Sequence, residues 1–313
     1  MTRFLVRRLL VSVVVVWAIA TLVFFMLRMV PGDPIGAMLA DVDPSAAEAL
    51  RARLGLDQPV YVQYARWMFN MLRGDMGNSI YGSNQPVRQI IAEALPRTLS
   101  ISLVAIVIAL LISFTAGIVS AVKKGTWMDH VVTFIAILGL SMPSFWLGIL
   151  LIIVFAVNLN WLPAIGYAPL SDGFWPWFSH IILPAIAVGT PFAAIIARMI
   201  RSSMLEVSRE DFIRTARSKG LSARVVLVRH TFRNALIPVV TVMGIAFALL
   251  MTGAVIVENV FAIKGLGRVL IQSILNRDYP VVQGAILIVS LVFVATNLLV
   301  DVLYTVIDPR IRY

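Results

Sequence analysis

A series of long apolar stretches without charged side chains limits most strongly what this chain can fold into. The first covers residues 9–27, and five more lie between ionisable residues at positions 97 and 123, 130 and 172, 180 and 198, 233 and 258, and 278 and 301. About 20 apolar residues are enough for a helix to cross the hydrocarbon core of a membrane. Because 60% of the residues are apolar and only 13% are charged, the chain lacks the polar surface of a soluble domain. We therefore predict an all-α polytopic membrane protein with six transmembrane helices.

The distribution of Lys and Arg predicts which ends of these helices face the cytoplasm. Lys123 and Lys124 follow the second apolar stretch, nine Lys or Arg lie within residues 198–233 after the fourth, and two Arg follow the sixth. The loop at residues 158–179 has neither, although the loop after the fifth stretch contains three. Cytoplasmic loops of membrane proteins are enriched in Lys and Arg, so both chain ends are predicted to be cytoplasmic.

The predicted organisation has four parts. The N-terminal tail and first helix occupy residues 1–30, an extracytoplasmic loop residues 31–94, a core of five helices residues 95–305, and a cytoplasmic tail residues 306–313. The first apolar stretch is longer than that of a signal peptide and lacks a small-residue cleavage site, which favours a helix that stays in the membrane. Within the loop, capping and helical spacing predict short helices at residues 46–54 and 61–72, and a turn at residues 74–78.

Several predicted spans contain helix breakers and small polar residues at mid-depth. Pro143 lies in the third span, and Pro184 and Pro191 lie in the fourth. Irregular backbone in a membrane is tolerated where it is buried in protein or lines a wet cavity. Simple kinks, and polar packing between helices, remain open as explanations. The candidates for a sparse polar lining of a pathway are Ser141, Pro143, Ser144, Thr190, Thr241 and Thr252.

The absence of charge within the spans argues against a self-contained carrier. Ion-coupled carriers and pumps hold their ion at ionisable groups inside the bilayer, and this chain has essentially none between its helix ends. No Walker A pattern occurs, so the chain needs an energising partner that binds nucleotide in its place. A membrane-embedded enzyme is the second alternative, but His130, His180 and His230 are scattered at or beyond helix ends and cysteine is absent. We expect no catalytic site, no metal site and no cofactor.

A cytoplasmic loop at residues 200–234 is the candidate point of contact with the energising partner. Its basic character alone fits a second explanation, in which anionic lipid headgroups hold the loop at the membrane. That alternative does not explain the capping residues or the small residues of the loop. A short helix lying along the membrane and joined to two spans is suited to transmit a push from a cytosolic partner.

Two helical pieces are expected within this loop. Ser208 is expected to cap a short amphipathic helix at residues 208–218. Helical spacing places Phe212, Thr215 and Ala216 on one face of that helix. The helix is expected to end at Gly220, in a left-handed conformation, and Ser222 is expected to cap a second piece at residues 223–234.

Several motifs, in order along the chain, carry a family resemblance. The loop contains the run EDFIRTARSKGL at residues 210–221, then Arg229 and His230, then RNALIP at residues 233–238. Elsewhere the chain contains PGDP (31–34), LGLDQP (54–59), GDMG (74–77), LPRTL (95–99), GLGR (265–268), RDYP (277–280) and DPRIRY (308–313). These motifs resemble those of ABC-importer permeases of the dipeptide, oligopeptide, glutathione and nickel class, first-permease type. Arg214 stands where the wider permease family has Glu, so no acidic role is assigned to it, and Glu210 is a neighbouring candidate.

The resemblance implies the type I ABC importer permease fold, in a bacterial cytoplasmic (inner) membrane, and a set of partners. These are a second homologous permease subunit, two ATPase subunits and a periplasmic or lipid-anchored solute-binding protein, with membrane lipid around the helices and no nucleic acid. ATP hydrolysis by the separate ATPases would drive import of peptides or a peptide-like solute. The resemblance leaves the substrate open among dipeptides, oligopeptides, glutathione, nickel chelates, haem, opines and oligosaccharides.

The resemblance also implies roles for individual residues. The residues that would couple the chain to the ATPases are Glu210, Asp211, Phe212, Arg214, Thr215, Ala216, Gly220, Arg229, Asn234 and Pro238. The residues expected to face the binding protein are Asp33, Asp57, Gly265, Arg268, Asp278 and Tyr279.

Overall fold

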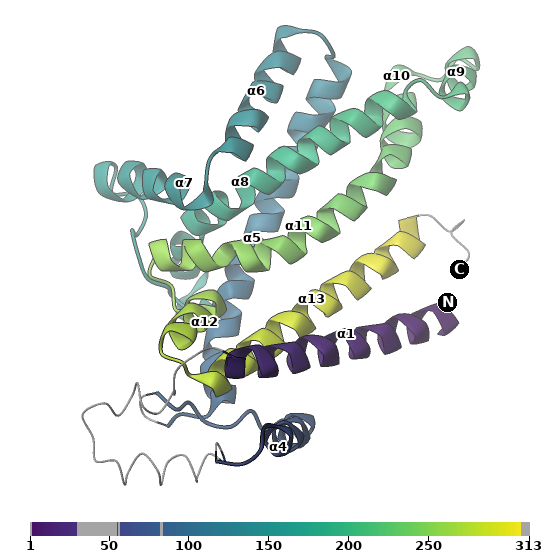
Figure 1. Cartoon of the computed structure of the whole chain (residues 1–313). Coiled ribbons are helices and arrows are strands. Elements are labelled where there is room, and N and C mark those ends of the chain that lie inside the picture. The colour runs from purple at the N-terminus through teal and green to yellow at the C-terminus, as the bar shows by residue number, and fades with distance from the viewer. Residues whose placement is uncertain (1, 30–54, 56, 82–83, 308–313) are drawn as a thin grey trace. The chain divides into compact units, whose positions relative to one another are not determined.

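The structure is a computed structural model that describes residues 2–29, 55, 57–81 and 84–307. Within these residues the chain is helical, and one isolated β-bridge joins Asn78 and Pro86, so the all-α prediction is confirmed for the described part (Figure 1). The contacts divide the chain into two compact units. The first draws on Met1–Pro96 and Arg268–Val294, and the second on Arg97–Gly267 and Ala295–Tyr313.

The first unit is organised around the contact between its first helix and an amphipathic helix that follows. Its elements are α1 (Thr2–Met29), α4 (Val60–Leu72), the start of α5 (Val87–Val122), most of α12 (Leu266–Leu275) and the first half of α13 (Tyr279–Ile307). An aromatic cluster joins α1 to α4, with the Phe24 ring 5.2 Å from that of Tyr64 and 5.1 Å from that of Trp67. The predicted helix at residues 61–72 is therefore confirmed, whereas the one predicted at residues 46–54 lies outside the described residues.

The second unit is a helical bundle in which α8 is the central element. Helix α8 packs against α6, α7 and α11 (Figure 1). Besides most of α5 and the second half of α13, the elements of this unit in chain order are α6 (Trp127–Ser141), α7 (Ser144–Leu151), the π-helix η1 (Ile152–Asn158), the 3₁₀-helix η2 (Leu170–Asp172), α8 (Phe174–Val207), α9 (Asp211–Ser218), α10 (Ala223–Val225), the π-helix η3 (Val226–Phe232) and α11 (Arg233–Val260).

The six predicted spans agree with the structure if a strongly bent pair of helices counts as the third. Five described helices are long and apolar enough to cross a membrane, and a sixth span exists only as the pair formed by α6 and the segment Ser144–Asn158, bent by 103°. Met142 is extended and Pro143 follows it as the N-cap of α7. A proline disfavours helical geometry in the residue before it and has no N–H to continue the helix, which accounts for the break. The second predicted span also begins earlier than expected, at Val87 rather than at residue 95.

Small residues let α5 and α8 approach each other closely. A Cβ atom added at Gly189 would lie 2.8 Å from the carbonyl oxygen of Ala105, and one added at Gly117 would lie 2.8 Å from that of Ala197. Small residues at such contacts are typical of helix packing in membranes, where tight van der Waals contact replaces the hydrophobic drive. Pro184 and Pro191 lie within α8, which continues as a helix through both of them.

A buried polar junction holds the second unit together near the end of α11. The Thr98 hydroxyl donates to a carboxylate oxygen of Glu258 and accepts the backbone N–H of Leu266 at 2.8 Å. Thr98 and Glu258 are both buried. A Cβ atom added at Gly265 would lie 2.2 Å from the same carboxylate, so this glycine leaves room for the glutamate. The junction therefore joins the LPRTL motif to the GLGR motif, which are distant in sequence.

The first unit contains a comparable junction around Asp278. This carboxylate is 3% exposed and accepts hydrogen bonds from the Ser79 hydroxyl and from the backbone N–H groups of Ile80, at 3.2 Å, and Tyr81, at 3.4 Å. A buried carboxylate is stabilised by several such donors. Asp278 thus joins the RDYP motif to the segment that follows the GDMG motif.

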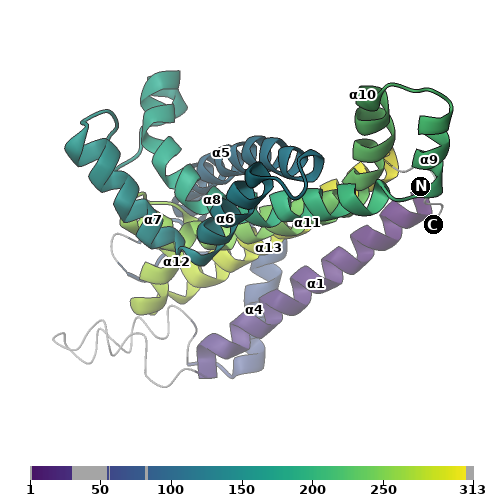
Figure 2. The same cartoon turned by 90° about the horizontal axis from the view of Figure 1, so that it is seen from above.

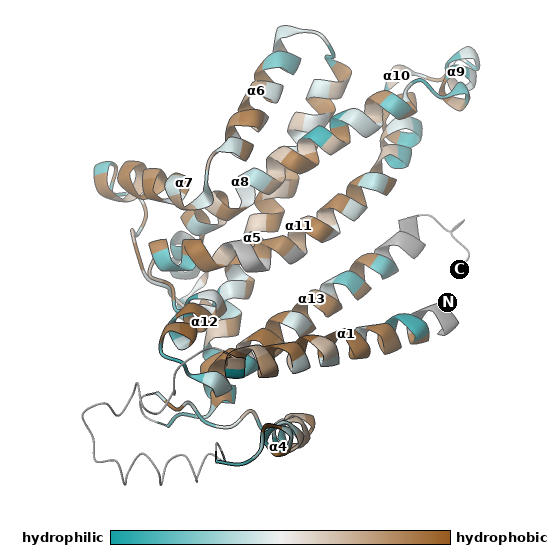
Figure 3. Cartoon of the chain, viewed as in Figure 1, coloured by the Kyte–Doolittle hydropathy of each residue, from teal (hydrophilic) through white to brown (hydrophobic). Residues whose placement is uncertain are grey.

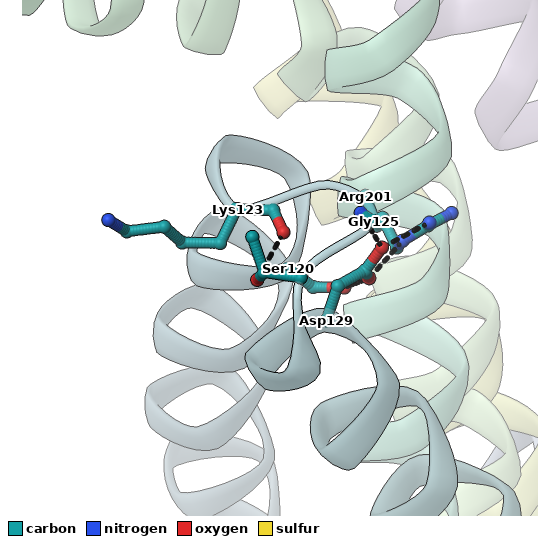
Figure 4. Close-up of polar contacts among 6 residues, drawn as sticks. Ser120, Lys123, Gly125, Asp129 and Arg201 are labelled. Atoms are coloured by element: carbon teal, nitrogen blue, oxygen red, sulfur yellow. Dashed lines mark hydrogen bonds and ion pairs between the residues drawn. The ribbon is translucent and has the colours of Figure 1, made fainter.

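A third junction locks the C-terminal part of α8 to the first turn of α6 and the turn before it (Figure 4). The Asp129 carboxylate makes a bidentate ion pair with Arg201, with Nε–Oδ1 and Nη2–Oδ2 distances both of 2.8 Å. It also accepts the Ser120 hydroxyl and, at 2.9 Å, the Gly125 N–H. Asp129 is 2% exposed, and the Arg201 side chain is 31% exposed. This lock fixes the part of α8 that leads directly into α9.

Replacing Thr98 by Val tests the first junction. The change keeps the side-chain shape but leaves the buried Leu266 N–H without its acceptor, so we expect the free energy of unfolding to fall by about 2 kcal/mol. Thr115→Val is the matched control, because the Thr115 hydroxyl bonds only to carbonyls of its own helix. Thermal or denaturant unfolding in detergent measures both variants, and equal stabilities would contradict the proposed role of Thr98.

Replacing Asp129 by Ala tests the lock on α8. Arg201 would keep its charge without its main partner, and we expect the free energy of unfolding to fall by about 2 to 3 kcal/mol, less than for a fully buried pair because Arg201 is partly exposed. Asp211→Ala is the control, since Asp211 pairs with Arg214 at 3.4 Å on the exposed surface. An equally small effect of both substitutions on unfolding would show that the lock is not stabilising.

Candidate functional site

The candidate site is the short helix α9 and the segments on either side of it. Helix α9 lies beyond the ends of α8 and α11, at the end of the second unit away from α7 (Figures 1 and 2). Hydrophilic residues gather there, whereas the middle parts of α8 and α11 are predominantly hydrophobic (Figure 3). This is the end that the Lys and Arg distribution predicts to be cytoplasmic.

The start of α9 differs from the prediction. The helix begins at Asp211 with Glu210 as its N-cap, and no side chain caps it by a hydrogen bond. Ser208 instead ends α8, where its hydroxyl donates to the Leu205 carbonyl at 2.8 Å. The hydroxyl could not serve both helices, because α8 extends further than the sequence indicated. Asp211 lies in the first turn of α9, where the helix dipole favours an acid.

The two faces of α9 have different environments. Ile213 and Ala216 are buried and form a small apolar cluster with Val226, against which Val207 packs. Phe212, 44% exposed, and Thr215 point to the outside. Ala216 lies one turn after both Phe212 and Ile213, so it has the helical position expected next to Phe212, but its side chain is buried with Ile213.

The end of α9 is confirmed at Gly220. This residue has φ of +78°, and the Leu221 N–H returns to the Ala216 carbonyl at 3.4 Å, as in a Schellman cap. No atom lies within 4 Å of the position that a Cβ on Gly220 would take. The glycine is thus required by its backbone conformation and not by crowding. Ser222 lies at the predicted N-cap position of the next piece, although its side chain makes no capping hydrogen bond.

The second predicted piece leads without a break into α11. α10, η3 and α11 follow one another directly from Ala223 to Val260. Arg229 is exposed within the π-helix η3, and Asn234 is exposed in the first turn of α11, where its amide donates to the His230 carbonyl at 2.6 Å. Pro238 is half-buried within α11. The segment that follows α9 is therefore joined to a membrane span by a continuous helical backbone.

A hollow lies beneath α9, between it and the bundle. Its volume is about 300 Å³, and it is lined by the ends of α5 and α8 on one side and by η3 on the other. Arg217 of α9, Ser208 and Thr231 supply its polar groups. Helix α9 is consequently anchored by the Ile213 cluster and only loosely supported elsewhere.

The candidate pathway residues have mixed surroundings. Ser141, Pro143 and Thr241 are exposed, and Ser144 and Thr190 are half-buried, while the side chain of Thr252 lies outside the described part. The hydroxyls of Ser141 and Thr190 donate to carbonyls one turn earlier in their own helices, at 2.9 Å and 2.7 Å. Ser141, Pro143 and Ser144 all lie at the break between α6 and α7.

The residues expected to face a binding protein divide into two groups. Gly265, Asp278 and Tyr279 are buried in the chain, and their contact with a binding protein stays a prediction. Gly265 makes room for Glu258, and Asp278 binds the Ser79 segment. Asp57 is exposed and Arg268 is half-buried. Asp33 lies outside the described residues.

Sequence reasoning missed the partners that these motifs have in the structure. In the sequence, Thr98 belongs to the LPRTL motif, Glu258 marks the end of the fifth apolar stretch, and Arg201 is one of many basic residues. Nothing in the sequence indicates that Thr98 contacts Glu258 or that Arg201 has an acidic partner. Asp129, next to a basic turn and at the start of an apolar stretch, was the available signal for the lock with Arg201. An acid at that position is unusual beside a membrane span and calls for a cationic partner.

Two family models match this chain. The model described as binding-protein-dependent transport system inner membrane component matches residues 113–313. A model for the N-terminal part of the same kind of membrane component matches residues 1–102.

Curated relatives match over the full length of the chain. A Brucella abortus protein named as a peptide transport system permease is 46% identical, and the match covers 100% of both chains. The glutathione transport system permease protein GsiC of Escherichia coli is 42% identical, again over 100% of both chains. The dipeptide transport system permease protein DppB of Alkalihalophilus pseudofirmus is 41% identical with the same coverage.

A solved structure shares the fold at low sequence identity. The inward-facing MetNI methionine ABC transporter has a chain that matches with a TM-score of 0.58 and 17% identity, over 71% of this chain and 97% of that chain. The chain therefore belongs to the family of binding-protein-dependent transport system inner membrane components, the permease subunits of ABC importers, and within it to the group that contains the peptide, dipeptide and glutathione permeases named above.

Proposed function

We propose that this chain and a second homologous permease together enclose the pathway of an importer for peptides or a peptide-like solute, driven by two ATPase subunits. The family assignment favours this importer over an ion-coupled carrier or a membrane-embedded enzyme, and in this family ATP hydrolysis belongs to a separate subunit. The names of the relatives support a peptide-class substrate for this chain.

The observation that carries the proposal is the division of α9 into an anchored face and a free face. Ile213 and Ala216 fix α9 to the end of the bundle, so a force on α9 reaches the spans. Phe212 and Thr215 are left exposed, one turn apart, on the side that a cytosolic subunit would contact. An exposed aromatic side chain on a small projecting helix is suited to fill a groove on a partner.

The basic side chains around α9 support the docking of an ATPase in a second way. Arg214, Arg217 and Lys219 are exposed on or next to the helix. Charges at the rim of an interface raise the association rate and orient the partner, even where they add little affinity. Glu210 and Asp211 at the start of α9 give the helix charges of both signs, which restricts the orientation in which a partner fits.

The lock between Asp129 and Arg201 supports a rigid connection between α9 and the bundle. Arg201 lies two turns before the end of α8, and α9 follows after a short connection. Closure of the ATPases would therefore move α8 and the turn between α5 and α6 together, and not bend α8 alone. The continuous helical backbone from Ala223 to Val260 provides the second connection to a span.

The break between α6 and α7 supports a role for Ser141, Pro143 and Ser144 in the pathway. Interrupted helices in transporters present backbone polar groups at mid-depth, which a peptide-like solute can use. Among the described residues expected to face the binding protein, Asp57 and Arg268 remain the candidates for that contact, because the others are buried.

Purification of the tagged chain from its native membranes tests the assembly and the docking role of Phe212. We expect an ATPase and a second permease to co-purify, and Phe212→Ala to lower ATPase recovery about ten-fold, since a central aromatic anchor accounts for much of an interface. The control is Phe174→Ala, which removes another exposed ring, 64% exposed against 44% for Phe212, at the other end of α8. Unchanged ATPase recovery with Phe212→Ala would contradict the anchor, and recovery of the chain alone would contradict the assembly.

Substitution of Gly220 tests the coupling role of α9. Gly220→Val forces a β-branched residue into φ of +78° and should distort the end of α9, while Gly220→Asn should be tolerated better because Asn adopts this region more readily. We expect Val to lower the uptake rate at least several-fold without affecting membrane insertion. Gly74→Val, with φ of +79° and open surroundings outside the loop, is the control. Normal uptake with Gly220→Val would contradict the coupling role.

A further inference from the structure

Helix α7 and the π-helix η1 that continues it form one apolar arm, residues 144–158, which leaves the bundle at the end of α6. The arm contains no ionisable side chain and is hydrophobic over most of its length (Figure 3). It is bent by 103° from α6, so it runs nearly perpendicular to that helix (Figure 1). Helix α6 has 15 residues and is about 22 Å long, shorter than the hydrocarbon core of about 30 Å. The chain therefore turns before α6 has crossed the membrane.

The contacts of the arm with α8 place it in the outer leaflet. A Cβ atom added at Gly148 would lie 3.7 Å from the Cβ of Ala187 on α8. Two residues further along α8, and deeper in the membrane, Gly189 meets Ala105 of α5. Ala105 lies eight residues after Arg97, at the end of α5 that the predicted topology makes extracytoplasmic. Eight residues of α-helix are about 12 Å long, less than the roughly 15 Å of one hydrocarbon leaflet.

The two faces of the arm differ in the size of their side chains. On the inner face Gly148 is buried, and Leu151, Ile152 and Phe155 pack against the core of the second unit. Up to residue 157, the exposed face carries only large apolar residues at helical spacing, which are Phe145, Trp146, Ile149, Ile153, Val154 and Val157. Helix contacts inside membranes are enriched in small residues, as between α5 and α8. The exposed face is therefore suited to lipid acyl chains and not to close packing with another helix.

Exposed tryptophans lie at both ends of the arm. Trp146 is in its first turn, and Trp161 follows its end, with its ring 6.0 Å from that of Phe155. Asn158 and Asn160 are also exposed at this second end, which we call the tip. Tryptophan is enriched at membrane–water interfaces, where its ring lies at the level of the headgroups. An arm along the membrane plane brings both ends to that level, whereas an arm across the bilayer would bring only one.

The chain on both sides of the tip is fixed to one residue of the bundle. A Cβ atom added at Gly148 would lie 3.0 Å from the ring of Phe261, which follows α11. Beyond the tip, the Gly166 N–H donates to the carbonyl of Phe261 at 2.9 Å. The arm is consequently a fixed projection of the second unit, and its depth is set by the bundle.

We propose that the arm lies along the plane of the membrane in the outer leaflet, with its exposed face against lipid acyl chains and its tip at the headgroups. Helix α6, which precedes the arm, also exposes large apolar residues such as Phe134, Ile135 and Leu138, so the arm continues a surface that already faces the membrane. The third apolar stretch is then a span that ends in an in-plane anchor. This anchor sets the depth of the break at Ser141 and Ser144, which is the start of the arm.

Single cysteines test the depth of the arm, because the chain contains no cysteine of its own. Ile149, Ile153 or Val157 on the exposed face is replaced by Cys, and each variant is purified from native membranes with the subunits that accompany it. The cysteine is labelled with a bimane fluorophore, and the protein is placed in bilayers whose lipid carries a bromine quencher near the headgroup or near the chain end. We expect about two-fold stronger quenching by the shallow bromine at all three positions, because an interfacial helix keeps them at one depth.

The pattern along the arm distinguishes the alternatives. An arm across the bilayer would separate Ile149 from Val157 by about 10 Å in depth, so a change from deep to shallow quenching between them would overturn the proposal, as would deep quenching at both. No quenching by either lipid would overturn it in favour of a protein subunit on this face. Val131→Cys and Leu138→Cys are the matched controls, because both positions of α6 are equally exposed and a crossing helix moves the label from shallow to deep between them.

The tip allows a second measurement that needs no purification. Asn158→Cys should react with a membrane-impermeant maleimide added outside spheroplasts, because the tip lies at the extracytoplasmic headgroups. Ile153→Cys, which faces acyl chains, should not react. Lys219→Cys, exposed after α9, is the control and should react only once the membrane is opened. An Asn158→Cys variant that reacts only from the cytoplasmic side, or from neither side, would contradict the position of the arm.

Discussion

The bidentate ion pair between Asp129 and Arg201 is the interaction on which the α9 end of the second unit depends. It joins the turn after α5 to the last turns of α8, and α9 continues from there. The carboxylate is almost fully buried, with Ser120 and Gly125 satisfying its remaining acceptor capacity. Because removing one partner of such a pair is costly, the ion pair holds α6 against α8. If α9 docks on an ATPase as proposed, a force on it would then reach both α8 and α6.

The two junctions around Glu258 and Asp278 bring together motifs of this chain that are distant in sequence. Each places one buried carboxylate where it receives hydroxyl or backbone donors from another motif. Neither carboxylate is on the outside, and Gly265 is small because a side chain there would meet Glu258. These residues stabilise the unit in which each junction lies, and the proposed contact with a binding protein falls to exposed residues such as Asp57.

The all-helical fold and the position of α4 could be predicted because the spacing of apolar residues determines them. The end of α9 at Gly220 could be predicted because it depends on local backbone conformation. Gly220 is required by its own conformation, which is a local property. The inward position of Ala216 could not be predicted, since a helix of eight residues shows its buried face only through what it packs against, here Val226 and Val207. The pairing of Asp129 with Arg201 depends on a contact 72 residues apart, and spacing along the chain carries no signal for it.

The π-helix between α10 and α11 has a mechanical consequence. Seven residues from Val226 to Phe232 are wound more widely than an α-helix, in a helical backbone that is otherwise continuous from α10 to the membrane span. Each residue of an α-helix advances the chain by about 100° around its axis, so tightening a single π-turn would rotate everything before it by that amount relative to α11. Torsion about the helix axis, more than bending, is thus the deformation that this segment can pass between α9 and the bilayer.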